Sequence, residues 1–73
     1  MARIEVKSEV TGSVWKVEKA VGDQLAEDDV IMILESMKME ITVHAPKAGT
    51  LVEIKVQPEA SVEEDEVLCV VEV

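Results

Sequence analysis

The stretch VIMILESMKMEITVH, residues 30–44, holds two apolar runs on either side of Met37-Lys38. The first run is apolar throughout, and its length and β-branched residues favour a strand buried on both faces. If Met37 and Lys38 form a two-residue turn, the two runs pair as a hairpin. That register places Met32 opposite Val43, Leu34 opposite Ile41, Glu35 opposite Glu40, and Ser36 opposite Met39. The four apolar residues then share one face, so the hairpin has a continuous core stripe.

The turn of this hairpin uses unusual residues. Tight two-residue turns need positive φ and therefore favour pairs such as Asn-Gly. Methionine and lysine are each strained by about 1–2 kcal/mol in that conformation. Met37 and Met39 also flank a tip that a core does not easily reach. Because broken local rules tend to mark functional sites, Lys38 is the main candidate functional residue.

A sequence repeat extends outward from this hairpin over the whole chain. GSVWKV from Gly12 aligns with GTLVEI from Gly49, and LAEDDVIMILE from Leu25 aligns with VEEDEVLCVVE from Val62, both at an offset of 37 residues. We therefore expect one domain, residues 1–73, made of two half-repeats of about 1–36 and 38–73 that bury their apolar faces against each other. Lys38 corresponds to Met1 in this alignment, which places Lys38 and the two termini at opposite ends of the domain.

The apolar pattern predicts an all-β domain with approximate two-fold symmetry. Strands are expected at 3–7, 13–18, 30–35, 40–44, 50–56 and 67–72, with short strands near Leu25 and Val62. Alternation in the second half predicts that Val52, Ile54 and Val56 face the core. Trp15 and Val17 are their counterparts in the first half, and Trp15 is expected in the core or in partly exposed packing.

Composition excludes several classes of partner. The formal net charge is −9, which disfavours binding to nucleic acid. No apolar run approaches the ~20 residues of a membrane span, and no apolar signal core is present. The lone Cys69 cannot form an internal disulfide. We therefore expect a cytoplasmic protein with no membrane partner.

The stretch ESMKME, residues 35–40, resembles the biotinyl-lysine motif of biotin carboxyl carrier domains, especially small stand-alone ones. The resemblance extends to GSVWKV, VGDQL, HAPKAGTLVEI and EVLCVVEV. It implies a flattened barrel or sandwich of two four-stranded antiparallel sheets, with biotin joined by an amide to Lys38. It also implies that Met37 and Met39 position Lys38, and that a biotin protein ligase recognises Glu35, Ser36 and Glu40.

By the same resemblance, a biotin carboxylase loads carboxylate onto the biotin and a carboxyltransferase passes it to an acceptor such as an acyl-CoA. The carrier itself catalyses neither step. Some relatives carry an extra loop, or thumb, over the biotin, and the constant repeat offset implies that this chain lacks one. The family tends to have glycine where this chain has Asp28, Glu59 and Asp65, and an apolar residue at Lys19. Those turns are therefore expected to be rebuilt or strained.

Three other interpretations remain open. A lipoyl carrier has the same fold and also modifies a hairpin lysine, but Met37 and Met39 disfavour it. An unmodified interaction module would use its acidic surface, with VEEDEV, residues 62–67, as the best feature. An enzyme would have to use Ser36, His44 or Cys69, which form no recognisable catalytic constellation. Lys38 is not an evident nucleophile either, and it is interpreted as an acceptor that another enzyme modifies.

Overall fold

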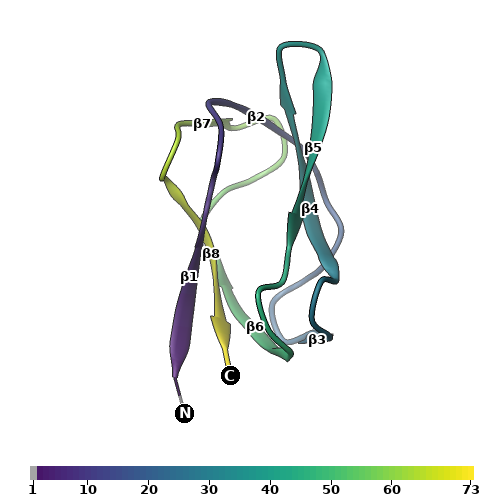
Figure 1. Ribbon diagram of the computed structural model, residues 1–73, viewed down its shortest axis with the longest axis vertical. Helices are drawn as coiled ribbons and strands as arrows, with labels where there is room; N and C mark the ends of the chain where they lie inside the picture. The colour runs from purple at the N-terminus through teal and green to yellow at the C-terminus, as the bar shows by residue number, and fades with distance from the viewer. Residues whose placement is uncertain (1) are drawn as a thin grey trace.

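The computed structural model describes residues 2–73, all of whose regular structure is β-strand (Figure 1). The strands are β1 (Arg3–Lys7), β2 (Gly12–Val17), β3 (Gln24–Leu25), β4 (Val30–Ser36), β5 (Met39–His44), β6 (Gly49–Ile54), β7 (Ser61–Val62) and β8 (Val67–Glu72). The six long strands lie within two residues of their predicted bounds, and both short strands are present. The all-β prediction is confirmed.

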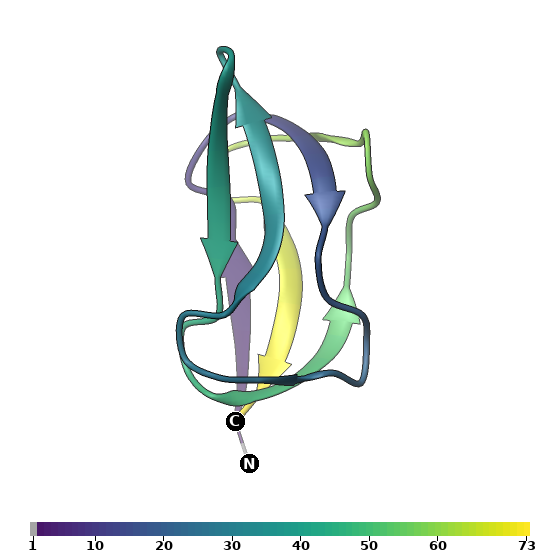
Figure 2. The ribbon, with the colours of Figure 1, turned by 90° about the vertical axis from the view of Figure 1, so that its right-hand side faces the viewer.

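The strands form two four-stranded antiparallel sheets, with orders β1-β8-β6-β3 and β5-β4-β2-β7 (Figure 2). Each sheet takes two strands from each half of the chain, and in each sheet strands of one half pair with strands of the other. The two halves therefore do not form separate sheets, because their strands are interleaved in both sheets. Pairing across halves satisfies the backbone groups that a separate half-sheet would leave unpaired at its edges.

The hydrogen bonds between loops and strands recur at an interval of 37 residues. The Gly22 N–H donates to the Leu51 carbonyl at 2.7 Å, and the Glu59 N–H donates to the Val14 carbonyl at 2.7 Å. Likewise, the strand order of one sheet maps onto that of the other when each strand is exchanged for its counterpart in the repeat. Each residue at one end of the sandwich thus has a structural counterpart at the other end.

The molecule is elongated, with extents of 36 × 18 × 17 Å. The β4–β5 hairpin occupies one end of the long axis, and both chain ends lie at the other (Figure 1). At that second end, Ala2 and Val73 exchange two backbone hydrogen bonds of 3.1 and 2.8 Å. The predicted separation of Lys38 from the termini is confirmed for the described residues, while Met1 itself lies outside them.

The core lies between the sheets and is entirely aliphatic apart from sulfur-containing side chains. Its fully buried residues include Val14, Ile31, Met32, Leu34, Leu51, Val62, Leu68, Cys69 and Val71. Burial in the first strand of the hairpin is close to prediction, since Ile31, Met32 and Leu34 are inaccessible and Ile33 is half-buried. This burial of apolar surface is the main stabilising term that the chain offers, because Cys69 is its only cysteine.

The predicted alternation in the second half is wrong at its start. A bulge shifts the β6–β8 register between Leu51 and Glu53, so Leu51 is fully buried whereas Val52 is only half-buried. A second bulge, at the equivalent position of the other half, shifts the β2–β4 register between Val14 and Lys16 and leaves Trp15 as the extra residue. Trp15 is 49% exposed and does not belong to the core. A bulge inserts one unpaired residue and resets the faces, which a simple period of two cannot predict.

The unusual turns keep the conformation that glycine would favour. Asp28, Glu59 and Asp65 have φ of 70°, 72° and 69°, close to one another and all positive. The turns are therefore strained rather than rebuilt. Gly22, the counterpart of Glu59, has φ of 99°, and a Cβ atom there would meet nothing within 4 Å. Lys19 is half-buried, whereas its counterpart Val56 is buried.

Candidate functional site: the β4–β5 hairpin

The hairpin tip is a two-residue turn made by Met37 and Lys38, whose φ angles are 50° and 65°. Positive φ at both positions is typical of a type I′ turn, whose twist matches the twist of the flanking strands. The predicted register is confirmed at every pair, including Ser36 with Met39 and Glu35 with Glu40. Because the strands are held by regular pairing, the strain of the turn is concentrated on the two residues that the sequence singled out.

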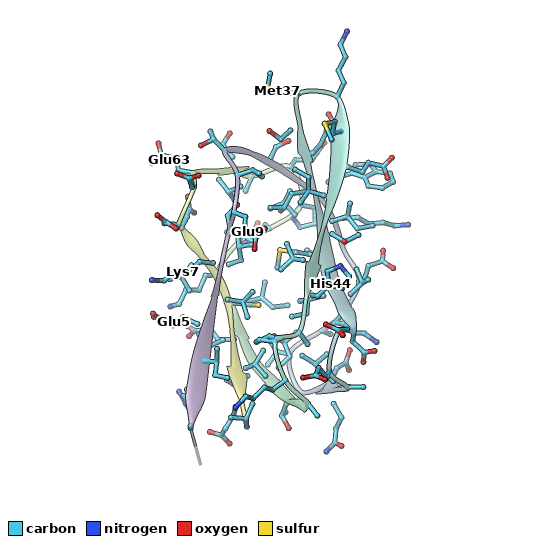
Figure 3. The ribbon with its side chains drawn as sticks, in the orientation of Figure 1. Glu5, Lys7, Glu9, Met37, His44 and Glu63 are labelled. Carbon is cyan, nitrogen blue, oxygen red and sulfur yellow. The ribbon has the colours of Figure 1, made fainter. Side chains whose placement is uncertain are left out.

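The side chains at the tip are exposed and unpaired. Met37 is 92% exposed and Met39 64% exposed, an unusual placement for large apolar side chains. Lys38 is exposed as well and makes no ion pair with any residue in the range 2–73. Figure 3 shows Met37 at the outermost end of the hairpin, above the labelled side chains of Glu63 and His44. The Lys38 amine is thus accessible to a large partner from several directions.

The base of the hairpin is fixed to the rest of the sandwich. The Ser36 hydroxyl donates a hydrogen bond of 2.8 Å to the Thr11 carbonyl, and Ser36 is half-buried. Gly12 begins β2 directly against the end of β4, and a Cβ on Gly12 would collide with the Glu35 carbonyl oxygen. Glycine is needed here for close approach of two backbones. The turn therefore projects from a rigid support, not from a mobile loop.

The two carboxylates beside the tip lie on adjacent strands. Glu35 and Glu40 are a directly opposed pair, and both are exposed. Like charges in this position are mildly destabilising. Of the six residues that the sequence assigned to the site, the structure gathers all six within one turn and the two strand ends that carry it.

No connection between strands is long enough to form a flap over the tip. The longest ones, residues 18–23 and 55–60, hold six residues each, and residues 8–11 form the link between β1 and β2. Within residues 2–73, the connections between strands are therefore too short to hold the thumb that some relatives carry.

The remaining reactive side chains have structural roles. Both ring nitrogens of His44 are engaged, Nε2 with the Thr42 hydroxyl at 2.6 Å and Nδ1 with the Asp28 carbonyl at 3.0 Å. Cys69 is fully buried, and burial raises the pKa of its thiol to about 11. A thiol of this kind is unreactive. Neither residue is near Ser36 in the strand pairing, so the described residues offer no catalytic constellation of these three.

The acidic run at residues 62–67 forms a local turn. The Glu66 carboxylate accepts a hydrogen bond of 3.0 Å from the Glu63 N–H, and residues 63–66 are exposed. In residues 2–73 no three carboxylate, histidine or cysteine side chains come together as a metal site would require. The same range contains no helix of the length and apolarity that crossing a bilayer demands.

Sequence reasoning missed one feature of this end of the molecule. An open groove of about 530 Å³ runs beside the hairpin, and Trp15, Glu35 and Glu59 are among its lining residues. The sequence predicts Trp15 in the core or in partly exposed packing, and it does not reveal the bulge that exposes this side chain. The unequal halves of the repeat were the available signal, since Trp15 aligns with Val52 and Glu59 with Gly22.

Comparison with known proteins finds a family model and relatives that match most of the chain. Residues 4–72 match the family model described as "Biotin-requiring enzyme". The chain is 40% identical over 63 residues to the biotin/lipoyl attachment protein of Bacillus subtilis, covering 86% of each chain. It is 44% identical over 52 residues to the biotinylated protein TB7.3 homolog of Mycobacterium leprae, covering 71% of this chain and 73% of that protein.

A solved structure extends the likeness to a much longer protein. The urea carboxylase of Kluyveromyces lactis contains a region that superposes on 99% of this chain with a TM-score of 0.93 and 33% identity. The chain spans only 6% of that carboxylase. The two-sheet sandwich described above is thus a fold shared with a region of a carboxylase.

Proposed function

This chain belongs to the biotin/lipoyl attachment family, and we propose that it is a biotin carboxyl carrier with biotin attached to Lys38. The observation that carries the proposal is the tip itself, where a strained Met-Lys turn holds an unpaired amine at one end of a 36 Å molecule. Asn-Gly would make the turn with less strain but would supply no amine. The name of the mycobacterial relative, a biotinylated protein, favours biotin over lipoate.

The residues present fit an amide-linked group. Lys38 is exposed, has no ion pair within residues 2–73, and sits on a two-residue turn that keeps its side chain clear of the sheets. Biotin supplies a ring nitrogen that carries carboxylate. The chain supplies position: a rigid hairpin, anchored through Ser36 and Gly12, restricts where the tether starts. Tethering raises the effective concentration of the carried group at each enzyme that the domain visits.

The proposed partners act in sequence. A biotin protein ligase joins the biotin carboxyl group to the Lys38 amine, using ATP, with Met37 and Met39 positioning the lysine and Glu35, Ser36 and Glu40 recognised beside it. A biotin carboxylase then loads carboxylate, and a carboxyltransferase passes it to an acceptor. The carrier catalyses none of these steps. We propose a cytoplasmic location for this carrier, with residues 1–73 acting as one biotinyl domain.

Intact-mass measurement tests the proposal. The chain is incubated with a biotin protein ligase, ATP and biotin, and the result expected is a mass gain of one biotinyl group. Lys38→Arg should gain none, because arginine keeps the charge but offers no primary amine. Lys47→Arg, at another exposed lysine, is the matched control and should be modified like the parent.

A parallel incubation with a lipoate ligase distinguishes the two cofactors of the family. Modification of Lys38 by the lipoate ligase alone would replace biotin with lipoate as the carried group. Modification by neither ligase would refute the carrier proposal and leave the acidic interaction module as the remaining interpretation.

A further inference from the structure

The groove beside the hairpin combines an aromatic ring with carboxylates. It is lined by Ser13, Val14, Trp15, Glu35, Pro58 and Glu59. Trp15 is 49% exposed at the β2 bulge, and both glutamates are exposed. Glu35 is three residues from Lys38, so at most about 10 Å of extended chain separates them. The groove is therefore part of the surface that surrounds the tip.

The two-fold symmetry shows that the fold does not require these side chains. At the opposite end, Val52 replaces Trp15 and Gly22 replaces Glu59, while the backbone hydrogen bonds are equivalent. Val52 is half-buried and fills the same bulge, and Gly22 makes the same turn without a side chain. The hairpin end thus carries an exposed indole and a strained glutamate that the other end lacks. Features absent from the structural counterpart point to a role other than folding.

The chemistry of the groove favours a cationic side chain. Within residues 2–73, neither Glu35 nor Glu59 forms an ion pair with another residue. The Trp15 ring already attracts a cation, since Lys16 Nζ lies 5.6 Å from its centroid. A guanidinium group stacks on an indole and pairs with carboxylates, so arginine has the chemistry that suits each of these three groups. The net charge of −9 adds a general attraction for a basic surface.

We propose that this groove docks an arginine-bearing surface of the biotin protein ligase that modifies Lys38. The inference rests on the proposed function. A ligase must bring its active site to the lysine amine, only about five bonds of 1.5 Å each from the Cα atom, so its surface covers the hairpin closely. A standard interface buries about 800 Å² on each partner, equivalent to a disc of about 16 Å radius. A disc of that size centred on the tip reaches beyond Glu35, which is one of the residues that line the groove.

The proposal is tested by variants that give the hairpin end of the molecule the residues found at the end with the chain termini. Trp15→Val, Glu59→Gly and the double variant introduce the residues that the fold already uses at the equivalent positions. The initial rate of biotin addition gives kcat/KM for each. We expect a loss of about tenfold for Trp15→Val, because exposed tryptophans at interfaces are common hot spots. Glu59→Gly should lose about three- to tenfold, and its effect should shrink at high salt.

Stability separates docking from a structural role. Glu59→Gly removes a side chain from a position with φ of 72°, so its Tm should not fall. A variant that is at least as stable and yet is a poorer ligase substrate cannot owe the loss to unfolding. Glu59→Gln keeps the side-chain shape without the charge and should lose as much as Glu59→Gly. The matched controls are Val52→Trp and Gly22→Glu, which alter the far end and should leave kcat/KM unchanged.

The possible results distinguish a failure of the docking groove from a failure of the proposed carrier function. If the parent chain gains no biotin at all, the proposed function fails. If the parent is modified and the Trp15 and Glu59 variants keep kcat/KM within about twofold, the docking groove is refuted while the carrier function stands. If ligation is unchanged and only transfer of carboxylate by holo-protein slows, the groove belongs to a carboxylase and the ligase assignment is wrong.

Discussion

Replacing Met37 with glycine should make the protein more stable and a poorer substrate for biotin addition. Met37 has φ of 50°, and a left-handed conformation costs an ordinary residue about 1–2 kcal/mol. Its side chain is 92% exposed, so almost no buried apolar area is lost when it is removed. Glycine also destabilises the folded state by about 0.5–1 kcal/mol, because its unfolded chain has greater conformational entropy. The net expectation is a stabilisation of about 0.5–1 kcal/mol.

Urea or thermal unfolding measures this gain in the unmodified chain. For a domain of this size, 1 kcal/mol shifts Tm by about 4–8 °C, so an increase of about 2–8 °C is expected. Met37→Asn is a second variant, since asparagine tolerates positive φ and does not carry the entropic cost of glycine. Met39→Ala is the control, because Met39 is also exposed but lies outside the positive-φ pair.

Two results would contradict this reasoning. A lower stability of both Met37 variants would show that the methionine side chain contributes packing which its exposure conceals. A biotinylation rate equal to that of the parent would show that Met37 has no part in positioning Lys38, and would leave the strain at that residue without a functional explanation.

Three further predictions follow from the same region and from the core. Gly12→Ala should cost about 1–3 kcal/mol, because the new Cβ collides with the Glu35 carbonyl, and should slow biotin addition, as chemical denaturation and the ligase assay would show; a fully stable variant would contradict the close approach. Ser36→Ala should cost about 1 kcal/mol by removing the hydrogen bond to Thr11, with faster amide exchange at the tip as the readout, and unchanged exchange would argue against that anchor. Cys69 should make the protein sensitive to alkali: burial raises its pKa from the ordinary 9.0 of an exposed thiol to about 11, so its contribution is complete below pH 9 and is lost as pH rises to about 11. The loss should reach about 2–3 kcal/mol, and Cys69→Ala should lack this part of the pH dependence in parallel urea titrations.

The sequence determined the hairpin well because its signals are local. A two-residue turn at Met37-Lys38 allows one register, which puts Leu34 and Ile41 on a common face, and a slip of one residue would turn one of them to the opposite face. The six candidate residues were found for the same reason, since they are consecutive. The repeat located Lys38 opposite the termini without any knowledge of the sheets, because a two-fold relation holds whichever strands pair.

What the sequence did not reveal depends on contacts between distant strands. Exchange of strands between the halves follows from the pairing of β1 with β8 and of β2 with β7, which no local pattern encodes. The bulge at Trp15 was also hidden, since an apolar residue in an apolar strand gives the same pattern whether it faces in or out. Its exposure became evident only from the register of β2 against β4. The groove was missed because the sequence left open whether Trp15 is buried or partly exposed.

Symmetry also identifies which strain belongs to the fold and which to the site. Asp28 and Asp65 are counterparts in the repeat and have nearly equal φ. Gly22 and Glu59 are also counterparts, and both have positive φ. The sandwich therefore requires left-handed backbone at these turns in both halves. The turn at Met37 and Lys38 differs, because at the opposite end Ala2 and Val73 keep β1 and β8 paired by backbone hydrogen bonds with no turn joining them. Asn-Gly would connect β4 and β5 with less strain, so the strain at Met37 and Lys38 comes from the residues used and not from the connection itself. A strained turn that holds an exposed lysine between two exposed methionines therefore supports the proposal that Lys38 carries the attached group.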